Sequence, residues 1–333
     1  MGRAEGRLQV GLAESIRASG LRFAVTGATG WLGRAAAEVL ARALAPTGEM
    51  DRLLLFASRE RDIKLDAGPV MRVHPLRDLS EHPVDVLLHY AYVTREHADE
   101  RGVPDYVLAN LTITAEVLTA ITAHSLAFVA YASSGAASLA ASRPLDVRSD
   151  PYGAMKVMDE LVMRRAAANA GARSLVVRVY NVAGPWMRKS RAFALGDLLH
   201  QAAAGEQLTI RASRPVVRSF VDVQDIASVA IATALDSETG SDIVVETAGD
   251  EVIEVGDLAE RILAVLGRPR QDIVRAWDPT ALPDSYLGDG RAFHALAARA
   301  GVVLRPLDEQ IARTARGLGM TVDLGETHLP DRP

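Results

Sequence analysis

Tyr152 and Lys156 stand four positions apart and together carry the side chains that proton transfer needs. On a helix, this spacing places both side chains on one face, one turn apart. A free tyrosine has a pKa near ~10, which is too high for efficient acid–base chemistry at neutral pH, but a nearby ammonium favours the phenolate and lowers that pKa. The pair could therefore donate a proton to a carbonyl oxygen or remove one from a hydroxyl. Because this spacing often arises by chance, the prediction depends on the elements around it.

A glycine-rich stretch near the N-terminus could bind phosphate groups. The stretch, which lies between an apolar run and a helical pattern, reads Thr26-Gly27-Ala28-Thr29-Gly30-Trp31-Leu32-Gly33. Glycine permits a tight turn and lets backbone N–H groups approach a pyrophosphate, and the positive end of the following helix favours the same anion. A structural turn without ligand is the alternative, but the flanking strand and helix supply the context that a dinucleotide site requires. The predicted contacts are Gly27, Thr29, Gly30, Trp31, Leu32 and Gly33.

The end of the second apolar run bears on which dinucleotide is bound. This run ends Phe56-Ala57-Ser58-Arg59. An acidic residue there would hydrogen-bond the ribose 2′-hydroxyl of NAD, whereas Ser58 and Arg59 suit the 2′-phosphate of NADP, with Arg34 as a helper. A solvated loop arginine is the alternative interpretation of Arg59. We expect NADP(H), with NAD(H) as the second candidate.

The elements around these residues alternate between apolar runs and helical patterns. Strands are predicted at Leu21–Val25, Arg52–Phe56, Val70–His74, Val84–His89, Ala127–Tyr131 and Ser174–Val179, and helices at Arg34–Ala45, Tyr106–His124 and Tyr152–Ala170. Strands that alternate with helices indicate βαβ units and a parallel sheet, and mostly apolar runs indicate strands buried on both faces. The Tyr152 and Lys156 pair then lies on the helix that follows the fifth strand.

The regular alternation loosens after Asn181, where Gly184-Pro185 breaks the chain. We expect an N-terminal extension at 1–20, a dinucleotide-binding domain at 21–180, a mainly substrate-binding lobe at 181–320 interleaved with the last strands of the sheet, and a tail at 321–333. Within the extension, one side of a short helix would be lined by Leu8, Leu12 and Ile16.

Composition excludes several kinds of function. The chain has 333 residues, of which 49% are hydrophobic and 24% charged, and its net charge is −5. No basic field or basic block would attract nucleic acid or an anionic membrane. There is no cysteine, so disulfides, thiolate catalysis and cysteine-based metal sites are excluded, and we predict no metal site. A reducing cytoplasm fits this composition, and the first twenty residues lack the apolar core of a signal peptide.

Four stretches resemble the extended short-chain dehydrogenases/reductases, in particular the NAD-dependent epimerase/dehydratase family that modifies nucleotide sugars. They are the glycine-rich turn, the Tyr152 and Lys156 pair, the run Arg178-Val179-Tyr180-Asn181-Val182-Ala183-Gly184-Pro185, and the run Arg218-Ser219-Phe220-Val221-Asp222-Val223-Gln224-Asp225. The resemblance extends from about Leu21 to about Gly317. It implies a Rossmann-type, doubly wound parallel sheet with a smaller C-terminal substrate-binding lobe, and hydride transfer with a nicotinamide dinucleotide.

This resemblance assigns roles around the reacting atoms. Ser134, at the end of the fifth strand, would hydrogen-bond the reacting oxygen, and Ser133 beside it would contact the substrate. Tyr152 and Lys156 would contact the cofactor as well as form the acid–base pair. The segment His89-Tyr90-Ala91-Tyr92 resembles one that runs beside the cofactor, in which Ala91 matches and Tyr92 replaces the usual second alanine. We interpret His89 as a packed residue.

On the substrate side, Asn181 and Arg218 would contact the phosphates of a nucleotide sugar. An arginine suits this role because its planar fork matches phosphate oxygens. The alternative for Arg218 is a salt bridge to Asp222 or Asp225.

The sequence departs from the family pattern at two places, and the second departure bears on which reaction is catalysed. Where the family commonly has a glycine-rich turn before the arginine, this chain has Ala212-Ser213-Arg214-Pro215. Gly135 and Ala136 follow Ser134, where sugar 4,6-dehydratases carry the Asp-Glu pair that performs water elimination. Its absence argues against a dehydratase.

The leading hypothesis is an NADP(H)-dependent 4-ketoreductase of a nucleotide-activated sugar. The alternative enzyme is an NAD-dependent nucleotide-sugar 4-epimerase, which would use the same three residues, Ser134, Tyr152 and Lys156. A dinucleotide-sensing protein without turnover is disfavoured by retention of Ser134, Tyr152 and Lys156. The sequence leaves the nucleobase, the sugar and the stereochemistry open. By resemblance, we expect a homodimer formed through the helices Tyr106–His124 and Tyr152–Ala170.

Overall fold

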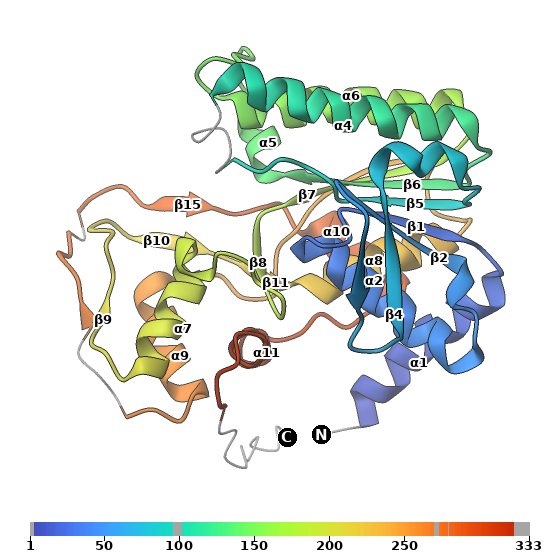
Figure 1. Cartoon of the computed structure of the whole chain (residues 1–333). Coiled ribbons are helices and arrows are strands. Elements are labelled where there is room, and N and C mark those ends of the chain that lie inside the picture. The colour runs from blue at the N-terminus through green and yellow to red at the C-terminus, as the bar shows by residue number, and fades with distance from the viewer. Residues whose placement is uncertain (1–2, 96–101, 270–272, 279, 323–333) are drawn as a thin grey trace. The chain divides into compact units, whose positions relative to one another are not determined.

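The computed structural model describes residues 3–95, 102–269, 273–278 and 280–322, with side chains from Gly11 onward in these ranges. The chain forms two compact units, whose elements Figure 1 labels. Unit 1 consists of Met1–Tyr180, Gln224–Thr247 and Gly288–Val303. Unit 2 consists of Asn181–Val223, Ala248–Leu287 and Leu304–Pro333.

Unit 1 is built on an eight-stranded sheet in the order β12-β7-β6-β5-β1-β2-β4-β3. Every neighbouring pair is parallel except β3 and β4. The strand order reverses between β1 and β5, which is the switch point of a doubly wound sheet and confirms the predicted fold. The strands are β1 (Phe23–Thr26), β2 (Leu53–Ala57), β3 (Arg61–Lys64), β4 (Val70–Pro75), β5 (Val86–His89), β6 (Phe128–Ser134), β7 (Arg173–Val179) and β12 (Asp242–Glu246).

Helices cover both faces of this sheet (Figure 1). One layer contains α4 (Val103–Ala123), α5 (Gly135–Ala141) and α6 (Pro151–Asn169), and the other contains α2 (Trp31–Leu44), α8 (Val223–Leu235) and α10 (Arg291–Arg299). All residues of β1, β5 and β6 are buried, which explains why their sequences are apolar runs rather than alternating ones. Short 3-10 helices occupy Ala45–Thr47, Met50–Arg52 and Leu76–Glu81.

Some elements of unit 1 were not predicted by residue range from the sequence. The strand β3 pairs antiparallel with β4 at the edge of the sheet, and three of its four residues are exposed, so it lacks an apolar signal. The short helix α5, which begins directly after Ser134, was not predicted either. The strand β12 adds the last parallel partner to β7 and is one of the last sheet strands that were expected from the 181–320 region, although its residues were not named. Each of these elements is short or lies at an edge of the sheet.

The N-terminal extension forms the helix α1 (Arg3–Ser19), which packs against α2. Ile16 is fully buried, as its predicted inward position requires, whereas the side chain of Leu8 lies outside the described part. The guanidinium of Arg52 donates to the backbone carbonyls of Ile16 at 2.7 Å and Arg17 at 3.2 Å. These carbonyls lie in the last turn of the helix, where the Ser19 hydroxyl and the Gly20 nitrogen also donate to them, so Arg52 adds to the C-terminal cap of α1.

Among the described helices, α4 is long and apolar enough to cross a membrane by length and composition. It packs within unit 1 against α6 and the 3-10 helix Leu76–Glu81. Its buried side chains include Tyr106, Asn110 and Thr114.

Unit 2 combines three helices with short strands. The helices are α7 (Ala194–Ala204), α9 (Val255–Val265) and α11 (Leu307–Gly317), and a 3-10 helix occupies Ser190–Ala192. The strands are β8 (Asn181–Ala183), β9 (Leu208–Thr209), β10 (Val216–Arg218), β11 (Phe220–Asp222), β13 (Ile253–Glu254), β14 (Ile273–Val274) and β15 (Asp284–Tyr286). They form a three-stranded sheet β13-β10-β15 and the pairs β11-β8 and β14-β9.

Candidate active site

At Gly27 and Gly33, the glycine-rich turn between β1 and α2 has no room for a side chain. Gly27 adopts a φ of +67°, and a Cβ there would lie 2.7 Å from the backbone nitrogen of Ala91. A Cβ on Gly33 would lie 2.2 Å from the carbonyl oxygen of Gly27. The Thr26 hydroxyl accepts a hydrogen bond from the Ala91 nitrogen at 3.2 Å. The turn and the segment after β5, which the sequence singled out separately, therefore lie in contact.

The N-terminus of α2 fits an anionic group. Its N-cap residue is Gly30, which has no side chain to cap the helix, and the first turn contains no acidic residue. The backbone N–H groups and the helix dipole are thus left uncompensated by carboxylates of that turn. Thr29, Trp31 and Leu32 are partly exposed there. Together with the close backbone packing at Gly27 and Gly33, this geometry suits the pyrophosphate of a dinucleotide.

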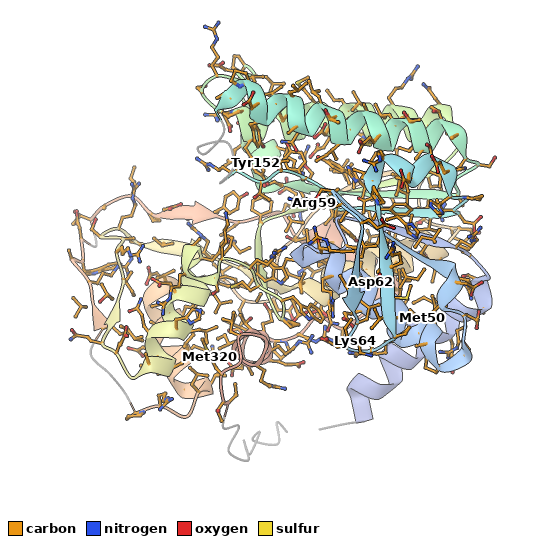
Figure 2. The ribbon with its side chains drawn as sticks, viewed as in Figure 1. Met50, Arg59, Asp62, Lys64, Tyr152 and Met320 are labelled. Carbon is orange, nitrogen blue, oxygen red and sulfur yellow. The ribbon has the colours of Figure 1, made fainter. Side chains whose placement is uncertain are left out.

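The residues predicted to select the cofactor lie at and beyond the end of β2. Ser58 and Arg59 are exposed, and Figure 2 labels Arg59. The guanidinium of Arg34, by contrast, forms an ion pair with Glu38 at 2.6 Å and donates to Asp66 at 3.1 Å. Arg34 therefore connects α2 to the residues that follow β3. Of the two arginines, Arg59 is the exposed one.

Ser134 is the last residue of β6 and also the N-cap of α5. Its hydroxyl oxygen accepts a hydrogen bond from the backbone nitrogen of Ala136 at 3.2 Å, in the usual manner of a capping serine. That bond uses one lone pair of the hydroxyl oxygen. The residues that follow, Gly135 and Ala136, form the first turn of α5 and bring no carboxylate to this position.

Tyr152 lies in the first turn of α6, at a helix start that the sequence specifies. The Asp150 carboxylate caps this start by accepting from the Gly153 nitrogen at 3.0 Å, and Pro151 occupies the first helical position. Lys156 follows one turn later on the same helix. The ring of Tyr152 lies edge-on to that of Tyr92, with ring centroids 6.0 Å apart.

Lys156 is almost completely buried, with 3% of its surface exposed. Its ammonium donates to the hydroxyl of Tyr131 at 3.1 Å and to the carbonyl of Ala132 at 2.9 Å. It also lies 3.5 Å from the centre of the Tyr92 ring. Burial lowers the pKa of Lys156 to about 7, and the nearby carboxylate of Asp159 acts in the opposite direction. The lysine therefore sits where its charge is sensitive to its neighbours.

His89 is packed rather than placed for catalysis, as predicted. It is 1% exposed, shares a hydrogen bond of 2.7 Å with the Thr26 hydroxyl, and stacks on the ring of Tyr131. Burial, followed by the charge of Lys156, lowers the pKa of His89 to about 3. The imidazole is thus neutral at physiological pH.

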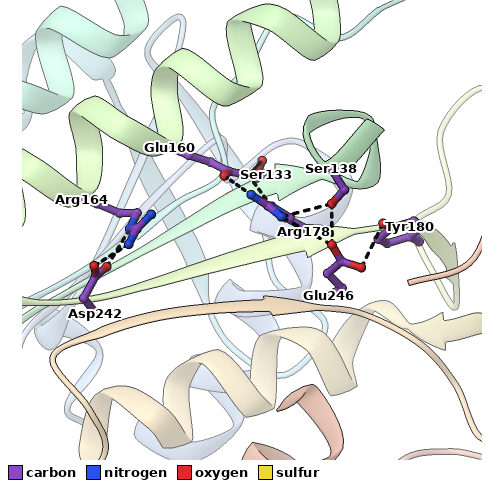
Figure 3. Close-up of polar contacts among 8 residues, drawn as sticks. All are labelled: Ser133, Ser138, Glu160, Arg164, Arg178, Tyr180, Asp242 and Glu246. Carbon is purple, nitrogen blue, oxygen red and sulfur yellow. Dashed lines mark hydrogen bonds and ion pairs between the residues drawn. The ribbon is translucent and has the colours of Figure 1, made fainter. Parts of the chain in front are cut away.

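A partly buried ionic network, drawn in Figure 3, includes Ser133 near the end of β6. Arg178 donates to both carboxylate oxygens of Glu160, at 2.9 and 2.8 Å. The hydroxyl of Ser133 donates to the same carboxylate at 2.5 Å, so Ser133 is bonded inside the protein, and its assignment to the substrate stays a prediction. Glu246 accepts from Ser138 of α5 and from the Tyr180 hydroxyl. The network joins α5, α6, β7 and β12 to the end of β6, next to Ser134 in the chain.

From the sequence, Asn110 was a residue that could cap or pack, and Tyr131 and Asp159 had no assigned role. Asn110 is fully buried and holds the backbone of Val93 with two hydrogen bonds, at 2.9 and 3.2 Å. These bonds fix the segment that carries Tyr92. The hydroxyl of Tyr131 accepts from the Lys156 ammonium and donates to the carboxylate of Asp159 at 3.2 Å. The replacement of alanine by Tyr92 and a carboxylate three residues after Lys156 were the available signals.

In unit 2, the two predicted substrate residues both bind neighbouring backbone or side chains. The amide of Asn181 donates to the carbonyls of Ser219 at 3.2 Å and Tyr286 at 3.0 Å. Arg218 forms an ion pair with Asp284 at 3.2 Å. The acidic partners considered from the sequence were wrong, because Asp222 is buried and pairs instead with Arg313 at 2.8 Å.

Comparisons with known proteins bear on this arrangement. The profile of the NAD dependent epimerase/dehydratase family matches residues 23–245. The chain is 29% identical over 147 residues to a dTDP-4-dehydro-6-deoxy-D-allose reductase from Streptomyces bikiniensis, a match that covers 44% of each chain. It thus spans under half the length of this relative. It is 27% identical to a UDP-glucose 4-epimerase from Azospirillum brasilense over 66% of this chain and 70% of the relative.

Among solved structures, the fold is similar to that of UDP-glucose 4-epimerase from Brucella ovis in complex with NAD. The TM-score is 0.71 at 17% identity, over 91% of this chain and 99% of that one. The family match covers most of the chain and includes the glycine-rich turn, β6 and α6. The chain belongs to the NAD-dependent epimerase/dehydratase family.

Proposed function

We propose that the protein is an NADP(H)-dependent reductase that delivers hydride to a keto carbon of a nucleotide-activated sugar, acting as a 4-ketoreductase. The observation that carries this proposal is the placement of Ser134 at the end of β6 with Tyr152 and Lys156 on α6, in the same unit as the phosphate-binding turn. The helix α5 begins Gly135-Ala136, so the acidic pair of a dehydratase is missing there. Similarity to the Streptomyces reductase supports the choice of reaction.

The residues of the chain divide the chemistry as follows. Tyr152 donates its phenolic proton to the carbonyl oxygen while the carbon is reduced, and Ser134 donates a hydrogen bond to the same oxygen and shares its developing charge. The ammonium of Lys156 favours the phenolate that remains on Tyr152. The bound dinucleotide would supply the hydride, held by Gly27, Gly30 and Gly33 at the start of α2 and by Ala91 beside them.

On the substrate side, we assign the diphosphate of the nucleotide sugar to Arg218, with Asn181 holding the backbone around it. The side chain of Arg218 is 19% exposed. Its ion-pair partner, Asp284, has a side chain that is 49% exposed. An exposed carboxylate partner can be exchanged for a phosphate at small cost, because surface ion pairs contribute little free energy. The planar guanidinium then binds two phosphate oxygens at once.

We assign the cofactor preference to Arg59, because the fold alone does not determine it: the similar Brucella ovis structure is a complex with NAD, and a similar structure from Pseudomonas aeruginosa is a complex with NADPH. Changing Arg59 to Asp should weaken NADPH binding at least tenfold relative to NADH, since a charge-assisted hydrogen bond contributes about 1.5–3 kcal/mol and a carboxylate repels the 2′-phosphate. Fluorescence titration of the two reduced dinucleotides measures this ratio. Arg61→Asp, at an exposed arginine in β3, is the matched control and should leave the ratio unchanged. An unaltered ratio in Arg59→Asp would reject the 2′-phosphate assignment.

The 4-epimerase is the second candidate, favoured by the similarity to the Azospirillum enzyme. An epimerase oxidises and re-reduces one carbon and does not release its cofactor, whereas a reductase exchanges cofactor at every turnover. We therefore expect the purified protein, after denaturation, to release little dinucleotide. Near-stoichiometric release of NAD would instead favour the epimerase and count against Arg59 as a 2′-phosphate ligand.

We also propose a homodimer formed through α4 and α6. These neighbouring helices expose large apolar side chains, namely Leu108, Leu111, Met158, Leu161 and Val162. Contiguous exposed apolar surface of this kind marks an interface. Leu161→Glu should convert a species of about twice 35.6 kDa into a monomer, as measured by light scattering after size exclusion. Leu139→Glu, at an equally exposed leucine of α5, is the control that should remain dimeric. A wild-type monomer would rule out the dimer.

A further inference from the structure

A buried carboxylate lies beneath the catalytic lysine. Asp159 is 2% exposed and follows Lys156 by three residues on α6. Its Oδ2 accepts from the hydroxyl of Tyr131 at 3.2 Å, and that hydroxyl in turn accepts from the ammonium of Lys156 at 3.1 Å. Its Oδ1 accepts from the hydroxyl of Thr114 at 2.8 Å. A continuous hydrogen-bonded path therefore joins Lys156 to Asp159 through a single phenol.

Asp159 differs from the neighbouring carboxylate of Glu160 in what balances its charge. Glu160 forms an ion pair with Arg178 of β7 at 2.8 Å. Throughout the described part of the chain, no arginine or lysine lies within ion-pair distance of Asp159, and its hydrogen bonds come from two hydroxyls. A buried carboxylate is costly unless a counter-charge lies near it. The nearest such charge is the ammonium of Lys156.

The other titratable groups around Lys156 are neutral at physiological pH or already paired. Burial raises the pKa of Tyr92 and Tyr131, which therefore stay protonated, and the pKa of His89 is lowered to about 3. Burial also raises the pKa of Asp159, while Lys156 lowers it. The groups around the ammonium are Asp159 and Glu160 of α6, Tyr131 of β6, His89 of β5 and Tyr92 after β5. Beyond them lie Tyr152, whose ring contacts that of Tyr92, and Tyr106 and Thr114 of α4.

We propose that Asp159 is a positioning residue which, through the hydroxyl of Tyr131, keeps Lys156 in its ammonium form and so sets the pH at which Tyr152 ionises. This role rests on the proposed function, in which the phenol of Tyr152 is the proton donor. No proton moves along the path from Lys156 to Asp159 in this role. The Tyr131 hydroxyl only donates a hydrogen bond to Asp159, and Lys156 keeps its own protons. Removal of the carboxylate removes the negative charge that favours the ammonium, and a less charged Lys156 no longer favours the phenolate.

The test is a pH titration of the tyrosines by ultraviolet difference absorbance, on protein without substrate or dinucleotide. Subtraction of the same titration in a background with Tyr152→Phe isolates the signal of Tyr152. Asp159→Asn keeps the size and hydrogen-bonding capacity of the side chain, and we expect Tyr152 to ionise roughly one pH unit higher. Tyr131→Phe keeps both charges but removes the bridging hydroxyl, and it should give a smaller shift in the same direction.

Glu116→Gln provides the matched control, because it removes one carboxylate from α4 beside Thr114, where Glu116 is only partly buried. It should leave the ionisation of Tyr152 unchanged. If Asp159→Asn does not fold, as judged by circular dichroism, Tyr131→Phe carries the test alone. An unchanged or lower pH of ionisation in a folded variant overturns the proposal. Because no substrate is used, this outcome is distinguishable from failure of the protein to reduce keto sugars.

Discussion

Replacing Tyr152 by Phe should lower kcat for keto-sugar reduction by roughly 10²–10⁴-fold, the range that a positioned general acid contributes. The phenyl ring can still lie edge-on to Tyr92, as the tyrosine does at 6.0 Å between centroids, so the fold should be retained. What the variant lacks is the proton that the carbonyl oxygen needs when the carbon is reduced. Steady-state kinetics with NADPH and a dTDP-linked 4-keto sugar measure the change.

The control for this variant is Tyr180→Phe. The phenol of Tyr180 donates to Glu246 at 3.1 Å within the ionic network of Figure 3, so its loss should affect stability more than turnover. Dinucleotide affinity should change far less than kcat in Tyr152→Phe, because the phosphate-binding turn is untouched. Turnover at the wild-type rate would remove Tyr152 from the acid–base role and would count against the whole proposed mechanism.

The second large effect is expected for Gly33→Ala. The new Cβ would lie 2.2 Å from the carbonyl oxygen and 2.6 Å from the carbonyl carbon of Gly27, both of which are backbone atoms that no rotamer change can move. Overpacking of this kind costs 1–3 kcal/mol or more. The turn must shift to accept the methyl group, so we expect a lower unfolding temperature and at least a hundredfold weaker binding of NADPH. Thermal unfolding and fluorescence titration measure the two effects.

Gly11 provides the comparison, because a Cβ there would meet no atom within 4 Å and the residue lies in the helix α1. Gly11→Ala should leave cofactor binding unchanged and stabilise the protein by up to about 1 kcal/mol, since alanine favours a helix over glycine by that amount. Wild-type affinity for NADPH in Gly33→Ala would mean that the turn does not form the dinucleotide site.

The parallel sheet could be predicted from the sequence because its central strands are buried on both faces. At β1, β5 and β6 every residue is buried, so the apolar run itself defines the strand. The edge strand β3 reads Arg61-Asp62-Ile63-Lys64 and exposes most of its residues, so only its pairing with β4 makes it a strand. The helix α5 is short, and its cap, Ser134, had been assigned a chemical role alone.

The polar surroundings of the site were harder to predict. Glu160 and Arg178 lie in different elements, and each alone resembles a surface charge, yet they form a largely buried pair. Which charges become partners depends on the three-dimensional arrangement of α6 and β7. In the same way, Arg218 pairs with Asp284, which is distant in sequence, rather than with the aspartates that follow it closely. Spacing along the chain predicted the Tyr152 and Lys156 pair because both lie on one helix.

The central claim is net hydride transfer to a nucleotide-linked keto sugar. The most direct test incubates the protein with a dTDP-linked 4-keto-6-deoxy sugar and NADPH that carries deuterium at the transferred position, followed by mass spectrometry of the sugar. We predict one deuterium in the product, bound to the former keto carbon, with one NADPH consumed for each sugar reduced. Recovery of the keto sugar without deuterium and without consumption of NADPH would contradict this account. Interconversion of a dTDP-linked hexose and its 4-epimer by the same protein, without added NADPH, would identify an internal redox cycle instead.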